Sequence, residues 1–237
     1  MQSNISRSYL IPSALGAGLS IRDEDEPVIN CFVLDTHYSP TTLEVSELFS
    51  NGAVFYGEYI LKTDWFGMPG HSAAGFLYSN AQRTALDTNP FLLLQLILAG
   101  ETPPTKNSAW TATYRVDQTL FVDSENPNRK WTLFADFGIT DGDPNPLQWF
   151  GNASLVGASP LPNRENDTIG IGYYHIGASS LPLLQIHGIS AENGVELFYN
   201  AAVTPWFHIT PDLQVLDPSQ RSTAASLLIG LRARLSF

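Results

Sequence analysis

The chain has 237 residues, 12 basic and 23 acidic side chains, and a formal net charge of −11 at pH 7. No stripe rich in lysine and arginine could neutralise phosphates, which argues against nucleic-acid binding. No apolar run approaches the ~20 residues that a membrane helix needs. The single Cys31 excludes an intrachain disulfide, and we expect it to be a small buried apolar residue.

Period-two alternation and Gly, Pro, Asn and Asp punctuation predict about eleven strands. In chain order the candidates lie near 9–22, 27–37, 52–64, 69–80, 110–122, 129–140, 147–157, 166–178, 194–203, 206–217 and 223–237. Between them, short links alternate with connections that include the three longest, as periplasmic turns alternate with external loops in an outer-membrane barrel. Closed bacterial barrels have even strand numbers, so an odd count predicts an incomplete barrel. We therefore expect a curved antiparallel sheet that stays open or closes imperfectly.

One connection, 81–109, is expected to be a long extracellular loop or a lumen insertion. It contains the longest apolar run, PFLLLQLILAG, at 90–100. Within 87–104 the pattern allows a short helix, an extra strand or a loop folded into the lumen.

The last strand separates its side chains into two faces. Leu231, Ala233, Leu235 and Phe237 share one face, and Ser236 and two arginines share the other. A terminal aromatic is unusual for a soluble domain, whereas a membrane barrel can end at its interfacial aromatic girdle. Earlier predicted strands show the same alternation. Their second face is too polar to form the interior of a β-sandwich, where both inner faces must be apolar. These patterns indicate an all-β protein, an antiparallel transmembrane β-barrel of about 10–12 strands.

A series of segments carries a family likeness: WTATYRVDQTL at 110–120, WTLFADFGITD at 131–141, PLPNRENDTIGIGY at 160–173, ELFYN at 196–200, PWFHITPDLQVLDP at 205–218 and the closing GLRARLSF. This series resembles the C-terminal half of carbohydrate-selective porins of the OprB type. The resemblance runs from about residue 110 to 237 and is weaker over 40–80. It implies a single porin domain over 1–237, part of a barrel of about sixteen strands, and passive diffusion of small carbohydrates across a bacterial outer membrane. Whether ions also pass is left open.

Sugars are neutral and polyhydroxylated, so a lining of mixed donors and acceptors suits them. The residues expected to line the lumen are Arg115, Asp117, Lys130, Asp136, Gln148, Asn152, Arg164, Asp167, Glu196, Asn200, His208, Asp212, Gln214, Arg232 and Arg234. An alternative for each is that its charge only braces the wet inner wall. The aromatics Trp110, Tyr114, Trp131, Tyr173, Tyr199, Phe207 and Phe237 are expected to face outward as girdle and lipid-facing residues.

No motif points to an enzyme. The chain has no G-x-S-x-G, P-loop or H-E-x-x-H sequence, and its histidines lack metal-ligand spacing. We expect no cofactor and no metal. The expected partners are sugars as solutes and outer-membrane lipid, with self-association left open. A soluble lectin-like or jelly-roll carbohydrate-binding protein is the alternative.

Overall fold

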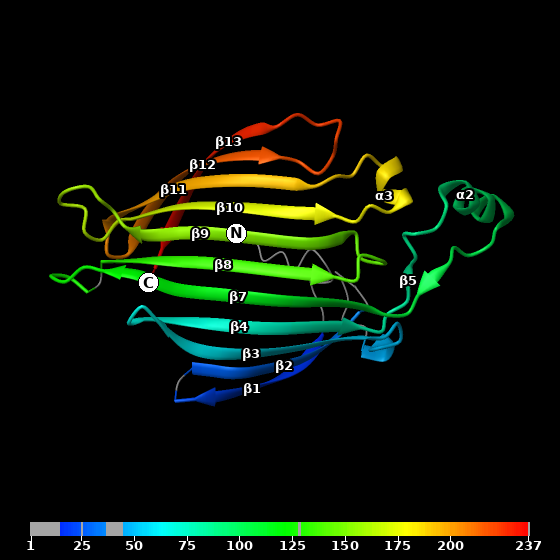
Figure 1. The fold of residues 1–237 in the computed structure, drawn as a ribbon, viewed down its shortest axis with the longest axis horizontal. Helices are drawn as coiled ribbons and strands as arrows, with labels where there is room; N and C mark the ends of the chain where they lie inside the picture. The colour runs from blue at the N-terminus through cyan, green and yellow to red at the C-terminus, as the bar shows by residue number, and fades with distance from the viewer. Residues whose placement is uncertain (1–14, 25, 37–44, 128, 237) are drawn as a thin grey trace.

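The computed structural model describes residues 15–24, 26–36, 45–127 and 129–236. Eleven strands form one sheet (Figure 1), and each is antiparallel to its sequence neighbour in that sheet. They are β1 (Gly16–Asp23), β2 (Glu26–Asp35), β3 (Ala53–Trp65), β4 (Met68–Ser79), β7 (Ala109–Val122), β8 (Lys130–Thr140), β9 (Leu147–Ala158), β10 (Thr168–Ala178), β11 (Glu192–Thr204), β12 (Phe207–Asp217) and β13 (Ser226–Leu235).

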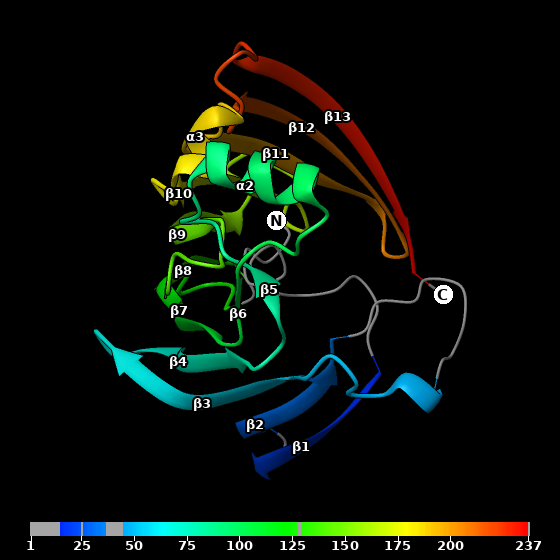
Figure 2. The same ribbon diagram turned by 90° about the vertical axis from the view of Figure 1, so that its right-hand side faces the viewer.

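All eleven predicted strands are present, and their ends differ by a few residues where the structure describes them. Positions 9–14 of the first candidate, 37 of the second and 237 of the last lie outside the described residues. The sheet order follows the chain from β1 to β13, and these two strands are its edges. Figure 2, seen from one end of the strands, shows the sheet as an open arc, as the sequence predicts. In the described part of the chain no second large sheet packs on the first. The structure therefore does not favour the lectin-like alternative, which needs two packed sheets.

The two faces of the arc differ in chemistry. On the convex face, aliphatic side chains are exposed: Ile229 is 81% exposed and Leu231 is 73% exposed. The concave face carries the polar residues, and among the described residues the only buried apolar cluster is Val54, Leu77 and Ala109. The predicted direction of the apolar side is confirmed. The expectation that Cys31 is buried is wrong: it pairs with Leu19 on the convex face and is exposed there.

Connections at the two strand ends differ in size. Short turns join β3 to β4 and β11 to β12, whereas the opposite end carries 80–108 and the link with α3 (Pro182–Ile186). The first of these links contains α2 (Pro90–Ala99), so the short-helix alternative for 87–104 is the one observed. Asn89 caps the helix by accepting a hydrogen bond from the Phe91 amide, and Gly100 ends it in the left-handed conformation.

The 80–108 loop is anchored at its base. The two-residue strands β5 (Arg83–Thr84) and β6 (Thr105–Lys106) pair with each other, and Lys106 forms ion pairs with Asp87 and Asp143. Helix α2 lies past the strand ends (Figure 1) and on the inner side of the arc (Figure 2). None of its side chains is buried. In the described residues, no helix is both long and apolar enough to cross a membrane.

Candidate functional site

A polar network crosses the middle of the concave face. Arg115 on β7 donates from Nη2 to Glu58 Oε1 on β3 over 2.7 Å, reaching across the small residues of β4. Asn30 on β2 donates to Glu58 over 3.1 Å. On the other side, Asp136 lies opposite Arg115 in the register and accepts from Asn152 Nδ2 over 3.0 Å. The strand register thus gathers three predicted residues, Arg115, Asp136 and Asn152, with the unpredicted Glu58.

A second cluster surrounds His71 on β4. Its Nδ1 lies 2.9 Å from Asp117 Oδ1, and its Nε2 lies 3.3 Å from Glu26 Oε2. Lys62 on β3 forms an ion pair with the same Glu26 oxygen at 3.3 Å. His71, Glu26, Asp117 and Arg115 help to line a cavity of about 250 Å³. Of this cluster the sequence predicted only Asp117 and Arg115.

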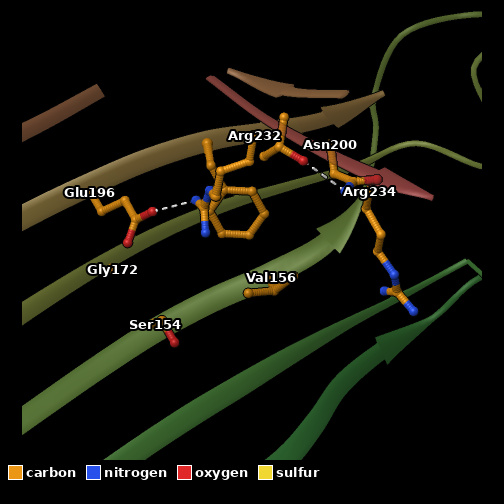
Figure 3. Close-up of a pocket in the computed structure, with 9 residues that line it drawn as sticks. Ser154, Val156, Gly172, Glu196, Asn200, Arg232 and Arg234 are labelled. Carbon is orange, nitrogen blue, oxygen red and sulfur yellow. Dashed lines mark hydrogen bonds and ion pairs between the residues drawn. The ribbon is translucent and has the colours of Figure 1, made fainter. Parts of the chain in front are cut away.

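A third cluster lies toward β13, and three of its members line the cavity of Figure 3: Glu196, Arg232 and Arg234. Arg232 donates from Nη2 to Glu196 Oε1 over 2.8 Å, and its Nε lies 3.4 Å from Asp212 Oδ2. Asp212 also accepts from Gln214 Nε2 over 2.8 Å. Arg234 lines the same cavity and extends away from the Glu196–Arg232 pair (Figure 3). All five residues were predicted for the lumen, and they lie together on the concave face.

The cavity beside this cluster measures about 430 Å³, and strands β9 to β13 contribute to its lining. That size falls within the ~300–1,000 Å³ of small-molecule sites. Asn200 is oriented from two sides: its Nδ2 donates to Thr210 Oγ1 over 2.9 Å, and His208 Nδ1 lies 2.8 Å from its Oδ1. The cavity lining therefore contains fixed amide, hydroxyl, carboxylate and guanidinium groups.

Two predicted residues lie near strand ends. Lys130 is the first residue of β8 and Gln148 the second of β9, and both side chains are exposed. By alternation they share the concave face with Asp136 and Asn152. Neither joins the three clusters.

Asp167 does not line the concave face, so that prediction is wrong. It is 2% exposed in the turn before β10. Arg164 Nε and the Tyr199 hydroxyl each donate to its Oδ2 over 2.5 Å, and the Ala202 amide donates to Oδ1 over 2.9 Å. Burial alone would raise the pKa of Asp167, but these hydrogen bonds and the Arg164 charge lower it below the usual value. Arg164 therefore braces this turn.

Several aromatics on the concave face were not predicted. By strand register, Phe32, Tyr56 and Phe198 point inward and lie beside glycines of neighbouring strands. By strand register, the described members of the predicted outward group all lie on the convex face: Trp110, Tyr114, Trp131, Tyr173, Tyr199 and Phe207. The Tyr199 hydroxyl also donates to Asp167 in the turn before β10. Phe237 lies outside the described residues. Within the described residues, no group of three or more His, Cys, Asp and Glu side chains could hold a metal ion.

Comparison with known proteins gives one family. A family model described as "Carbohydrate-selective porin, OprB family" matches residues 9–237. The high-pH structure of Pseudomonas putida OprB is 23% identical, with a TM-score of 0.72 over 90% of this chain and 57% of that chain. The low-pH structure is 19% identical, with a TM-score of 0.53 over 94% and 61%. The chain thus spans less than two thirds of either structure, and the likeness supports the fold. No curated protein is a significant match.

Proposed function

Because the chain belongs to the OprB family of carbohydrate-selective porins, we propose that its sheet forms pore wall in a bacterial outer membrane and that small sugars diffuse along its concave face. Selectivity in such a wall comes from lumen width, charges and hydrogen-bonding groups. The family is one of channels, and we propose that this chain likewise contains no catalytic centre.

The observation that carries the proposal is the direction of the apolar face. Scattered exposed aliphatic side chains are ordinary on soluble proteins, but a contiguous apolar patch beyond a few hundred Å² is rare. Here the convex face presents such residues on neighbouring strands, including Ile171, Leu197, Leu213 and Ile229. Contact with lipid removes the cost of exposing that surface to water.

The concave face supports a neutral, polyhydroxylated solute. Its charged groups are largely paired: Arg115 with Glu58, and Arg232 with Glu196 and Asp212. Paired charges retain free donor and acceptor positions for the hydroxyl groups of a passing molecule. A sugar can exchange its hydrogen bonds to water for hydrogen bonds to these groups one at a time. The lining therefore lowers the free energy that the sugar needs to enter the pore.

Liposome swelling tests this function. The full chain, refolded into vesicles, is expected to admit a monosaccharide faster than a trisaccharide. Ser154→Trp places a bulky side chain on the concave face and should slow monosaccharide entry. Ala153→Trp, one residue away on the convex face, is the matched control and should leave entry unchanged. Folded, inserted protein that admits no sugar, or two variants with equal effects, would contradict the proposal.

A further inference from the structure

We propose that the 430 Å³ cavity between β9 and β13 is a binding subsite for one pyranose ring, with Phe198 as its stacking platform. The proposal rests on the proposed function for the class of solute and adds a defined site to it. Phe198 was absent from the predicted lumen residues. It is the one aromatic side chain among the described residues that line this cavity.

The position of Phe198 follows from a glycine on the adjacent strand. Gly170 on β10 lies directly opposite Phe198 on β11. A Cβ atom at Gly170 would lie 2.4 Å from both Cε1 and Cζ of the phenylalanine ring. The ring therefore leans across β10 and fills the space that any other residue at position 170 would need. Packing against the sheet holds the ring in the wall, where it lines the cavity beside Val156 and Gly172.

Polar groups are fixed around this apolar surface. Glu196 and Asp212 engage two N–H groups of Arg232, which leaves three of its five donors for a ligand. Asn200 is oriented by Thr210 and His208, and one of its amide hydrogens remains available. The cavity thus combines an aromatic surface with donors and acceptors that are already positioned, so little ordering accompanies binding.

This combination favours a sugar ring over an open-chain polyol. A pyranose presents one flat face of C–H groups and a perimeter of hydroxyls. The C–H face can pack on the Phe198 ring while the hydroxyls meet Arg232, Glu196 and Asn200. An acyclic polyol of the same size has the same hydroxyls but no fixed C–H face. We therefore expect the site to bind a glucopyranoside more tightly than sorbitol.

Saturation-transfer difference NMR on the full chain folded in detergent micelles tests the site directly. Methyl β-glucopyranoside should receive saturation most strongly at its axial H1, H3 and H5 protons, and sorbitol should receive less. Phe198→Ala should weaken glucopyranoside binding about two- to tenfold, the range expected for loss of an aromatic contact. Phe198→Leu, which retains an apolar side chain above Gly170, should lose the axial-proton pattern as well.

Phe32→Ala is the matched control. Phe32 leans over Gly18 of the adjacent strand as Phe198 leans over Gly170, but it does not line this cavity. Glucopyranoside binding should be unchanged in this variant. Equal affinity for sorbitol and the glucopyranoside in the wild type, unchanged binding in both Phe198 variants, or an equal loss in Phe32→Ala would overturn the proposal. Because the assay reads binding in micelles, its failure is distinguishable from a failure of sugar flux in vesicles.

Discussion

Replacing Asp167 with asparagine should destabilise the protein by about 1–3 kcal/mol. Asn has nearly the same shape as Asp, but one acceptor oxygen becomes an amino group that faces donors. Three donors converge on the Asp167 carboxylate: Arg164, the Tyr199 hydroxyl and the Ala202 amide. Arg164 is 40% exposed and can turn to water. The Tyr199 hydroxyl also lies 3.1 Å from Ser159 Oγ and can donate there instead. The expected loss therefore comes from one weakened or lost hydrogen bond in a site where Asp167 is 2% exposed, at about 1–3 kcal/mol.

The same prediction has a pH dependence. The folded-state pKa of Asp167 is lowered, so its contribution to stability is present above the unfolded pKa of about 3.9 and is lost as pH falls through the folded pKa. Urea unfolding of the vesicle-refolded protein should show a constant difference between wild type and Asp167→Asn from pH 7 to 5, and a shrinking one below about pH 4.

Asp123 provides the matched control for this measurement. It caps another turn by accepting from the Glu125 amide over 2.9 Å, but its side chain is 33% exposed. Water can replace its partners, so Asp123→Asn should cost less than about 1 kcal/mol. Equal losses for the two variants, or an Asp167 effect that persists unchanged to pH 2, would refute the reasoning.

Two further predictions concern the wall near the Figure 3 cavity. Gly170→Ala forces the Phe198 ring to move and should cost about 1–3 kcal/mol in urea unfolding. Gly151→Ala should stay within about 0.5 kcal/mol, because its added Cβ would lie 3.7 Å from Phe137 Cδ2, an ordinary van der Waals contact. Equal effects of the two variants would contradict the packing argument. Arg232→Met leaves two carboxylates without their cation, so the reversal potential in a KCl gradient should shift toward cation selectivity. An unchanged potential would mean that Arg232 lies outside the conducting path.

Strand positions and faces could be predicted because they depend on short-range alternation. In β13, Leu231 and Arg232 point to opposite sides whatever their neighbours are, and the structure places them so. The strong contrast between its faces made the pattern easy to recognise. In β3 both faces carry apolar residues, with Tyr56 on the concave side and Tyr59 on the convex side. Alternation there does not distinguish the faces, and Glu58 was missed.

Contacts between distant strands could not be predicted, because they depend on register and on the size of intervening residues. Arg115 reaches Glu58 across β4, where Ala73 and Gly75 leave room. Arg164 and Asp167 are close in the sequence, but only the fold brings the Tyr199 hydroxyl to the same carboxylate. With this third partner, Asp167 is buried in the turn and does not line the lumen as expected.

The orientation of the two faces is tested most directly by one arginine placed on each. Leu213 and its neighbour Gln214 lie in mid-β12, on the convex and concave faces respectively. In a lipid bilayer, Leu213→Arg should reduce the free energy of unfolding by about 2–4 kcal/mol, the cost of arginine on a lipid-facing strand near the midplane. Gln214→Arg should change the free energy of unfolding by less than about 1 kcal/mol, because water and the neighbouring Asp212 carboxylate can solvate the new charge. The reverse order, or equal costs, would contradict a lipid-facing convex surface.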